Sequence, residues 1–559
     1  MKCVSGYDRE GFGAKFSDAA IIGHTTCCES RIWTRVKTEG EFSLVIFETF
    51  KKFSPDDIGK KPVDEYLREN NAHIKAQLKH TFKYSTDLTH VFQITGLAPQ
   101  TTYYYAVIAS PETKVSPRWR LGYEKSYSFK TMPEQSDTVS FGVTSCHDPF
   151  NKGYIAGGGL WDEFYDVLDE KNADFVLACG DQVYVDTTED DVWKWLNEHK
   201  DCLYKEYADD IDGLKAFCVS IYRRVYRKYW QSPGLQRVFS RFPTYMIWDD
   251  HEIMDGWGSY TEKERLALLD YSFDFGEDDL DEDEPEESDK FKRLLITSMF
   301  FAARKVYIEY QHSHNPQTDT DPQTNDIQLD YSFEQNNMGF YTLDMRSDHD
   351  FEKNPGDARL LGTSQFERFK SWIESDAAKA MDVLFIVASV PVVHWHSTFI
   401  NSLDKLAAKD DFRDEWDHES NYRERDKLLD LVFNYSASSG KAVVFLSGDV
   451  HSSAIFELTR DNAKRARIFQ FTSSSITRPP APWVAELMTL EKGRLGRNDS
   501  VEDNEVTRFK KRAFIAQYNF GLIECKKTTD GELSIWGSIY SGGRDTDVHG
   551  LSKKRVQFV

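Results

Sequence analysis

Four apolar runs of strand length end in side chains that can bind a metal ion, and this pattern constrains the fold most strongly. The runs and the potential ligands that follow them are 138–145 before Cys146, 173–179 before Asp181, 242–248 before Asp249 and Asp250, and 441–447 before Asp449 and His451. Open α/β sheets place their binding sites at the carboxyl ends of their strands. Because a buried carboxylate needs a cation to replace its lost hydration, the pattern predicts a metal site at the edge of a sheet.

The size and charge of the chain limit its class and its partners. With 559 residues, 40% of them hydrophobic, it is expected to be a soluble globular protein with more than one domain, or one large domain with insertions. The formal net charge of −23 disfavours duplex DNA and anionic membrane surfaces as partners. Eight dispersed cysteines without CxxC spacing argue against a dense disulfide framework.

The start of the chain bears on its location. No apolar run reaches membrane-spanning length, and the first residues contain no apolar core of signal-peptide length. The chain as written is therefore expected to be cytoplasmic. A secreted protein from which a leader has been removed is the alternative, and the oligomeric state stays open.

Residues 1–133 are expected to form an N-terminal β-sandwich domain. Short β-rich runs occupy this part of the chain, separated by polar or glycine breaks. Residues 91–107 couple two alternating strands through a Gly/Pro corner that Tyr103 is placed to anchor, and they are similar to the GLxPxTxYxYxV pattern of fibronectin-type domains. A helix-like segment at 63–78 is expected to be an insertion or a cover, and 133–137 to be the domain boundary.

Residues 138–559 alternate strand-like and helical segments, which predicts an α/β layer architecture. The expected helices are 160–168, 214–230, 364–380 and 422–436, and a strand at 383–390 leads to His394 and His396. The acidic run at 274–289 contains Pro285 and lacks EF-hand spacing. It indicates a surface loop inserted in this second domain rather than a calcium site.

The residue types at the strand ends suit a binuclear hydrolase. Such an enzyme needs a carboxylate that bridges two cations, terminal ligands on each cation and an open position for water. The aspartates and His451 can supply those ligands. Tyr184 and Cys146 add a phenolate and a thiolate, charged donors that suit trivalent iron better than magnesium.

Four motifs in this order resemble the alkaline phosphatase D (PhoD-like) family: SC at 145–146, GDQVY at 180–184, WDDHE at 248–252 and GDVH at 448–451. The family is related to the calcineurin-like metallophosphoesterases and to the purple acid phosphatases. The resemblance covers nearly the whole chain. It implies a two-sheet αββα sandwich of the metallophosphoesterase type behind a fibronectin- or Ig-like domain. It also implies a phosphomonoesterase or phosphodiesterase with ferric iron, Fe(3+), and one or more divalent ions, often Ca(2+).

Roles for individual residues follow from the same resemblance. It implies iron bound by Cys146, Asp181, Tyr184 and His451. Asp181 would bridge to a calcium-like ion that Asp449 also holds, with Asp250 as a further ligand. His251 would protonate the leaving oxygen or orient the phosphate.

One departure from the family leaves the metal open. Asp255-Gly256 stands where the family commonly has Asn-Asn, so a calcium ligand there becomes a carboxylate or is lost. Calcium or another divalent ion is therefore expected.

Further residues are candidate substrate contacts, each with a structural alternative. They are Asp255, Arg346, His394 and His396. Arg346 is also interpreted as one half of a charge pair with Asp344 that fixes the architecture, and either histidine as a structural one. Asp249 is explained equally well by a hydrogen bond to a backbone turn.

The sequence thus predicts a phosphoester hydrolase in which a metal-bound hydroxide attacks phosphorus and His251 assists departure of the leaving group. The expected partner is a small-molecule phosphoester, and monoester and diester are both open. The alternative is a catalytically silent binding protein that keeps the fold. Only Asp255 and the acidic insertion support that alternative.

Overall fold

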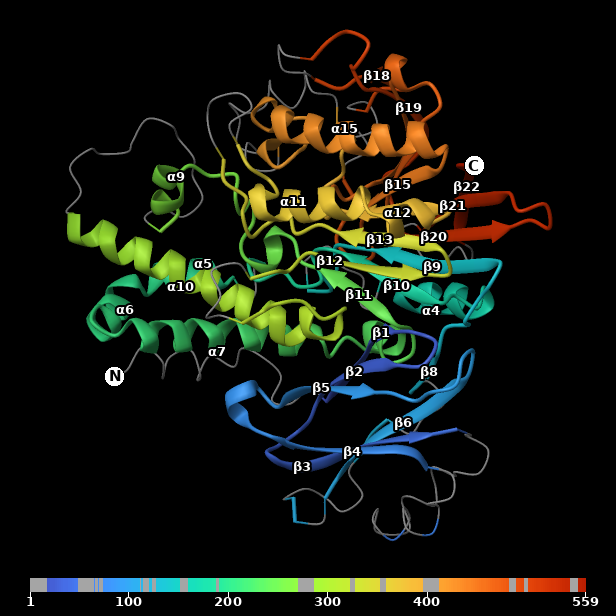
Figure 1. Ribbon diagram of the computed structural model, residues 1–559. Helices are drawn as coiled ribbons and strands as arrows, with labels where there is room; N and C mark the ends of the chain where they lie inside the picture. Colours follow the sequence, from blue (N-terminus) through green and yellow to red (C-terminus); the bar gives the residue numbers. More distant parts are fainter. Residues whose placement is uncertain are drawn as a thin grey trace.

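The computed structural model describes most of the chain. The described residues are 18–48, 65, 69, 74–110, 112–113, 120–122, 127–150, 159–187, 191–269, 286–321, 327–351, 358–395, 412–481, 489–496, 501–542 and 551–559. Figure 1 shows two groups of strands, a smaller N-terminal group and a larger group that carries most of the helices.

The N-terminal strands form two antiparallel sheets. One has the order β1 (Ala19–Thr25), β2 (Ser30–Arg35), β5 (Thr89–Ile94); the other has β4 (Ile74–Phe82), β3 (Gly40–Phe47), β6 (Thr102–Ala109), β7 (Arg120–Gly122), with β8 (Ser128–Lys130) paired to β6. Ile32 of the first sheet and Leu44 of the second are buried in one apolar cluster. The hydroxyl of Tyr103 accepts a hydrogen bond from the backbone N–H of Ala98 at 2.8 Å, so this tyrosine anchors the corner as predicted.

The helix-like interpretation of 63–78 is wrong for its last residues. Residues 74–78 belong to β4, which pairs with β3 along its length. Alternate residues of β4 are exposed and half-buried, the period of two that a strand covering one apolar face requires. Except for 65 and 69, residues 63–73 lie outside the described part.

The larger group contains two mixed sheets. The six-stranded sheet has the order β11 (Thr244–Ile247), β10 (Phe175–Cys179), β9 (Thr138–Thr144), β20 (Tyr518–Lys527), β21 (Leu533–Gly542), β22 (Ser552–Gln557). The eight-stranded sheet has the order β12 (Tyr331–Gln335), β13 (Met338–Thr342), β14 (Val383–Val387), β15 (Ala442–Ser447), β17 (Arg467–Thr472), β16 (Ser453–Thr459), β19 (Arg508–Ile515), β18 (Lys492–Arg494). Strands β9, β10 and β11 run parallel, as do β13, β14, β15 and β17.

Helices connect and cover these strands. They are α4 (Trp161–Glu170), α5 (Val192–Glu198), α6 (Lys200–Tyr207), α7 (Ile211–Tyr229), α8 (Pro233–Phe239), α9 (Glu262–Ala267), α10 (Glu286–Tyr310), α11 (Gly362–Ile373), α12 (Asp376–Ala380) and α15 (Tyr422–Ser439). The single helix expected at 364–380 is two helices, because Ser375 begins α12 by accepting a hydrogen bond from the N–H of Ala378. The acidic run also differs from expectation: residues 286–289 begin α10, and 270–285 lie outside the described residues.

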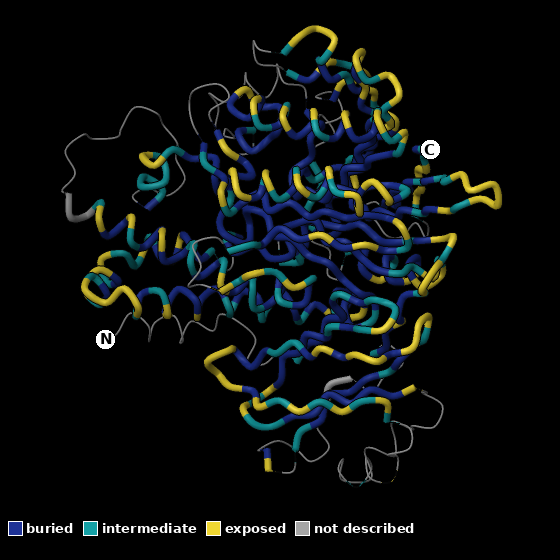
Figure 2. The backbone as a smooth tube through the Cα atoms, viewed as in Figure 1, coloured by how far each residue is buried: buried dark blue, intermediate teal, exposed yellow. Residues whose placement is uncertain are grey.

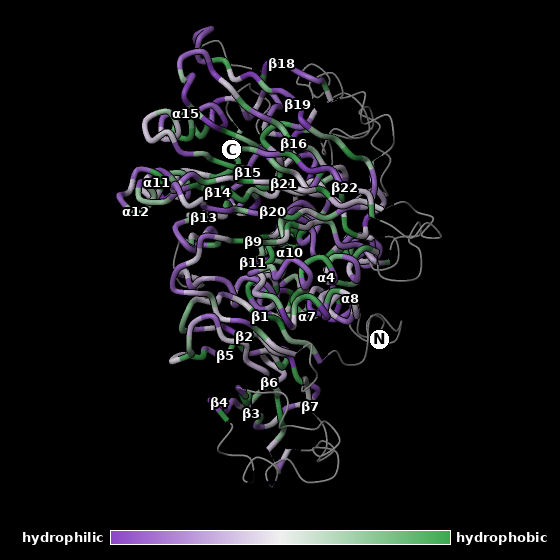
Figure 3. The backbone as a smooth tube through the Cα atoms, turned by 90° about the vertical axis from the view of Figure 1, so that its right-hand side faces the viewer, coloured by the Kyte–Doolittle hydropathy of each residue, from purple (hydrophilic) through white to green (hydrophobic). Residues whose placement is uncertain are grey.

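The two large sheets pack face to face. Phe141 of β9 meets Phe385 of β14 edge-on, with ring centroids 5.2 Å apart. On the outer face of the eight-stranded sheet, Leu384 shares a buried cluster with Phe369 of α11 and Leu428 of α15. The hydropathy view shows green stretches among these central strands (Figure 3), and the same strands are dark blue in the burial view (Figure 2). The mixed α/β class is thereby confirmed.

Most of the described cysteines are free thiols. Six cysteines are free thiols, four of them buried, and Cys202 is disulfide-bonded. Among the described helices, none combines the length and the apolar character that crossing a membrane requires.

Candidate metal centre

Four candidate ligands occupy equivalent positions in the fold. Cys146, Asp181, Asp249 and Asp449 each follow the last residue of a strand, β9, β10, β11 and β15 respectively, by two residues. These strands lie in two different sheets, and the face-to-face packing brings their carboxyl ends together. The sequence pattern therefore predicted the location of the cluster correctly.

The turns at these strand ends adopt an unusual backbone conformation. Ten described residues other than glycine have a positive φ, and four of them are Cys146 (56°), Asp181 (58°), Asp449 (66°) and His451 (49°). Such conformations cost about 1–3 kcal/mol each and concentrate at functional sites. They occur after β9, β10 and β15, whereas Asp249 after β11 has an extended backbone.

Two glycines allow the turns to approach one another. A Cβ atom on Gly180, which has a φ of 97°, would lie 2.7 Å from the Cβ of Asp249. A Cβ atom on Gly448 would lie 2.6 Å from the carbonyl oxygen of Cys179. The glycines of GDQVY and GDVH are thus needed for the close approach of three strand ends.

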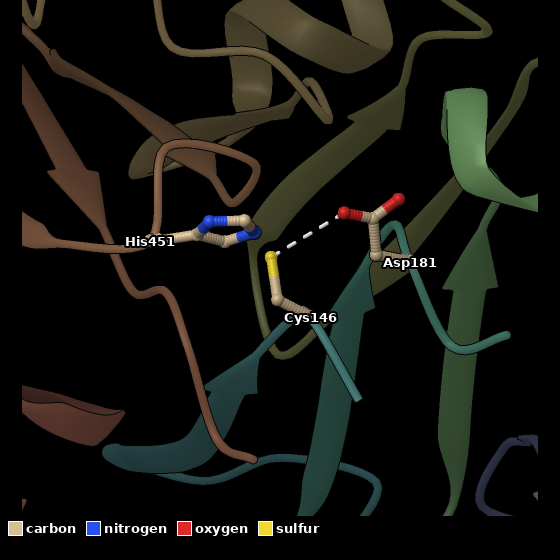
Figure 4. Close-up of side chains that lie close together, drawn as sticks. All are labelled: Cys146, Asp181 and His451. Atoms are coloured by element: carbon tan, nitrogen blue, oxygen red, sulfur yellow. Dashed lines mark hydrogen bonds between the residues drawn. The ribbon is translucent and has the colours of Figure 1, made fainter. Parts of the chain in front are cut away.

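Thiol, carboxyl, phenol and imidazole groups meet in the first half of the centre. The ligand atoms of Cys146, Asp181 and His451 lie within 4.8 Å of one another, and Figure 4 shows the three side chains converging from separate segments. The Tyr184 hydroxyl donates to Oδ2 of Asp181 at 3.0 Å and lies 3.4 Å from Nε2 of His451. The Cys146 thiol lies 3.5 Å from the same Asp181 oxygen. Hence the four residues expected to bind iron are adjacent.

Carboxylates alone make up the second half. Oxygen atoms of Asp181, Asp249, Asp250 and Asp449 lie within 4.8 Å of one another, and Asp181 also belongs to a third group with Asp250 and His251. Asp181 is common to every group, which is the geometry that a bridging ligand requires.

The donor set fits metal ions. Asp181 Oδ1, Asp249 Oδ2 and Asp250 Oδ1 are buried and have no hydrogen-bond partner among the described residues. Buried carboxylate oxygens are rarely left unpaired, because their desolvation is costly. Cations would satisfy them, and the thiol and phenol beside Asp181 favour a softer or more highly charged metal on that side than the all-oxygen set does.

The pKa shifts of the candidate ligands also indicate that the cluster needs a cation. Burial raises the pKa of Asp449 well above its usual value, and the charges of Asp249 and Asp250 raise it further. Burial likewise raises the pKa of Asp181 and of the Cys146 thiol. Each of these groups is therefore costly to ionise until a cation lies beside it.

Arg346 is the buried counter-charge of this cluster. Its Nε donates to Asp249 Oδ1 at 2.5 Å, its Nη1 donates to Asp414 Oδ2 at 2.6 Å, and its Nη2 lies 3.5 Å from Asp250 Oδ1. Burial alone would raise the pKa of Asp250, but Arg346 and His251 lower it below its usual value. The expected charge pair between Arg346 and Asp344 is wrong, because Asp344 Oδ1 accepts from Trp248 Nε1 and from backbone N–H groups instead.

The two explanations weighed for Asp249 can be compared with its contacts. Its side chain accepts from Arg346 and from the Ser389 hydroxyl, at 2.8 Å for the latter, and its second oxygen stays unpaired among the described residues. The turn itself is held by Glu252, whose carboxylate accepts from the backbone N–H groups of Asp181, Gln182 and Asp249. Asp249 is thus placed as a candidate ligand, and Glu252 is a residue for which no role was predicted.

His251 is held by a partner that the sequence analysis missed. Its Nδ1 lies 2.9 Å from both carboxylate oxygens of Asp186. Its Nε2 lies 3.7 Å from Asp255 Oδ1, and its ring lies 4.0 Å from that of Tyr184, measured between centroids. Burial alone would lower the pKa of His251, but the charges of Asp186, Asp250 and Asp181 raise it well above its usual value.

The remaining substrate candidates differ in their surroundings. Asp255 is partly exposed and lies beside His251. His394 is 2% exposed, bonds Ser452 Oγ through Nε2 at 2.8 Å and packs against Trp395 and Phe514. These contacts match the structural alternative for His394. His396 lies outside the described residues.

Comparison with known proteins places the chain in a family. Residues 141–533 match the sequence model of the PhoD-like phosphatases. The chain belongs to the PhoD-like phosphatase family. The resemblance drawn from the four motifs is thereby confirmed.

Two relatives extend this finding. Alkaline phosphatase D of Bacillus subtilis (strain 168) is 23% identical over 434 residues, which cover 74% of this chain and 60% of the relative. The chain therefore spans about 60% of the length of this curated relative. A solved structure described as "Structure of PhoD" superposes with a TM-score of 0.62 at 15% identity, covering 98% of this chain and 91% of that one. At this identity the likeness shows a shared fold.

Proposed function

We propose that this member of the PhoD-like family is a metal-dependent phosphoester hydrolase that acts on small-molecule monoesters, diesters or both. The observation that carries the proposal is the sharing of Asp181 by every candidate metal group among the described residues. A shared carboxylate holds two cations at the spacing that phosphoryl transfer to water uses. The relative named alkaline phosphatase D supports the same reaction class.

The two halves of the centre would hold different metals. Cys146, Asp181, Tyr184 and His451 would bind ferric iron, because thiolate and phenolate stabilise a trivalent ion. Asp181, Asp250 and Asp449, with Asp249, would bind calcium or another divalent ion through oxygen alone. Bound cations would lower the pKa of a coordinated water and neutralise phosphate charge.

The protein groups around the centre would orient the reaction. Asp186 fixes the His251 ring through Nδ1, which leaves Nε2 as the nitrogen that can donate a proton to a leaving oxygen. Arg346 holds Asp249 and Asp250 in place through its ion pairs with both carboxylates. Asp255 lies beside His251 and would contact a substrate or a further cation there.

The fold is proposed to be of the metallophosphoesterase type. The facing sheets with helices outside correspond to an αββα sandwich, and the two N-terminal sheets to a fibronectin- or Ig-like domain at 1–133. Residues 138–559 would form the catalytic domain. A cytoplasmic location stays a prediction from the sequence alone.

Hydrolysis of p-nitrophenyl phosphate and bis-p-nitrophenyl phosphate by the purified protein tests the proposal. Turnover of at least one ester, lost in Asp181→Asn and retained in Asp174→Asn, is the expected result. Asp174 is a matched control, because it is also an aspartate beside β10, partly buried, but it precedes the strand. Absence of turnover of both esters, with iron and with calcium, manganese or magnesium supplied, would contradict the proposal and favour a silent binding protein.

A further inference from the structure

We propose that Arg478 is a phosphate-binding residue of the centre, which contacts a non-reacting oxygen of the phosphoester. This inference rests on the proposed function and names a substrate contact for it. The protein carries a formal charge of −23, and its candidate centre is lined with carboxylates. An anionic substrate is therefore best recognised by a local, correctly placed cation.

The backbone of Arg478 is fixed against the centre. Its N–H donates to the carbonyl oxygen of Cys146 at 3.1 Å, and its carbonyl oxygen accepts from the Ser475 hydroxyl. Three residues further on, the N–H of Ala481 donates to the carbonyl oxygen of His451 at 2.8 Å. The segment that carries Arg478 thus links the turns of two candidate iron ligands.

The side chain is also oriented, yet it remains in contact with solvent. Nη1 donates to Asp148 Oδ2 at 2.6 Å, and Asp148 is itself fully buried and accepts from the Tyr229 hydroxyl at 3.1 Å. The guanidinium carbon lies 4.7 Å from the ring centroid of Tyr184. The Arg478 side chain is nevertheless 25% exposed, so it is neither buried nor freely mobile.

Arg478 and Arg346 differ in their exposure to solvent and in their hydrogen-bond partners. Arg346 is 1% exposed and donates to two aspartates and a backbone carbonyl. Its Nη2 has no hydrogen-bond partner among the described residues, but it is buried and faces Asp250 rather than solvent. Arg478 has a single carboxylate partner among the described residues, reached through one nitrogen. A guanidinium has five N–H donors, so an edge of Arg478 is left for a phosphoryl oxygen.

The position lies beside the first half of the centre. Tyr184 lies between Arg478 and His451, through its ring contact with Arg478 and its hydroxyl 3.4 Å from Nε2 of His451. A phosphoryl oxygen at this edge would therefore lie beside the expected iron ligands. Because a monoester dianion carries more charge on its non-bridging oxygens than a diester monoanion, Arg478 should favour monoesters.

Binding of inorganic phosphate to the metal-loaded protein, by calorimetry, tests the inference without requiring turnover. Arg478→Met should weaken phosphate binding by about 10- to 100-fold, the range for loss of one charge-assisted hydrogen bond. Arg478→Lys should restore part of the affinity, since it keeps the charge but not the fork. In both variants the iron and divalent-metal content and the visible absorption band should stay as in the wild type.

Arg237→Met is a matched control. Arg237 also pairs with an aspartate, Asp162, at 2.9 Å, and also lies over a tyrosine ring, that of Tyr165, at 3.9 Å, but it belongs to α8 and packs against α4. Its replacement should leave phosphate binding unchanged. In steady-state assays, Arg478→Met should lower kcat/KM for p-nitrophenyl phosphate more than for bis-p-nitrophenyl phosphate, whereas Arg237→Met should change neither.

The outcomes separate this inference from the proposed function. Wild-type affinity for phosphate in Arg478→Met, with ester hydrolysis intact, would overturn the inference alone. Loss of metal from Arg478→Met and Arg478→Lys together with loss of phosphate binding would also overturn it, by assigning Arg478 to the architecture of the centre. The third outcome is a wild type that binds phosphate more tightly than Arg478→Met but hydrolyses neither ester. It would support the inference and contradict the proposed function.

Discussion

Arg346 donates from Nε to Oδ1 of Asp249 at 2.5 Å, and both side chains are buried. The same guanidinium pairs with Asp414 and lies near Asp250, so one cation offsets three buried carboxylates. Arg346→Met is expected to lower the stability by about 3–5 kcal/mol, because it leaves those carboxylates without their counter-charge. The measurement is the urea midpoint of unfolding.

A surface pair provides the control for this prediction. Arg359 pairs with Asp350 at 2.9 Å, and the two side chains are 60% and 37% exposed. Arg359→Met should cost less than about 1 kcal/mol. Equal urea midpoints for the two variants would contradict the prediction, because they would show that the three carboxylates do not need the charge of Arg346 for stability.

The location of the centre could be predicted from the sequence because its signal is local. Each apolar run ends where a strand ends, and each candidate ligand follows within a few residues. Parallel strands with buried faces read as continuous apolar runs, and their carboxyl ends meet at one edge. The family motifs then assigned chemistry to Cys146, Asp181 and His451.

The supporting residues could not be predicted, because their partners are distant in sequence. Arg346 meets Asp414 across 68 positions, and Arg478 meets Asp148 across 330. The strand-like run before Arg346 marked it as a candidate substrate contact or as the partner of Asp344, but nothing local indicated Asp414, and no pattern marked Arg478. Residues 74–78 were misassigned for a related reason: Ala, Gln, Leu and Lys favour helices locally, whereas pairing with β3 decides the structure.

Cys146→Ser is expected to reduce iron content strongly and to spare the divalent metal, since the thiol belongs to the first group alone. Asp181→Asn should reduce both metals, because every group shares this carboxylate. Metal analysis of protein purified without added metals measures both. Cys525→Ser is the matched control: Cys525 is also buried, but in the pairing of β20 with β9 it lies opposite Val139, at the other end of β9 from Cys146. Unchanged iron in Cys146→Ser would remove the thiolate from the ligand set.

Tyr184→Phe is expected to shift or abolish a visible charge-transfer band, because a phenolate bound to ferric iron absorbs in that region. The hydroxyl of Tyr184 lies 3.0 Å from Asp181 Oδ2, within reach of a metal bound there. Absorption spectra of the purified protein make the test. Tyr222→Phe should keep the band, because the equally buried Tyr222 donates to the carbonyl oxygen of Ile253. A colourless, iron-free yet fully active wild type would contradict the assignment of iron.

Asp174 gives a pH dependence of stability that is independent of the metals. Burial raises the pKa of this carboxyl to about 6 from its usual 3.8, although its Oδ2 accepts from the N–H of Ser140 at 2.9 Å. Between those two values the folded protein retains a proton that the unfolded chain loses, so stability falls as the pH rises and is constant above the upper value.

Asp174→Asn should therefore remove about 1–2 kcal/mol of pH-dependent destabilisation between about pH 4.5 and about pH 7. The urea midpoints of wild type and variant at the two pH values give the difference. Asp376→Asn, at a fully exposed side chain, should keep the wild-type dependence. Parallel pH profiles for wild type and Asp174→Asn would refute the raised pKa.

His251→Asn is expected to slow phenyl phosphate hydrolysis by about 10²–10⁴-fold and p-nitrophenyl phosphate hydrolysis much less. Phenolate is the more basic leaving group and needs a proton as the bond to phosphorus breaks, whereas p-nitrophenolate departs as a stable anion. Asp186→Asn should change the same ratio less, because it disturbs the orientation of the His251 ring but leaves the proton donor in place.

His394→Asn controls for a general effect of removing a buried imidazole, since His394 bonds Ser452, packs against Trp395 and Phe514, and belongs to no candidate metal group among the described residues. Its ratio of the two rates should equal that of the wild type. Equal slowing of both esters by His251→Asn, accompanied by loss of metal, would instead make His251 a ligand beside Asp181 and Asp250, with which it also forms a candidate group. If His251→Asn instead keeps its metals and changes the ratio of the two rates, proton donation is the role of His251, and the contact with Asp186 orients its ring for that role.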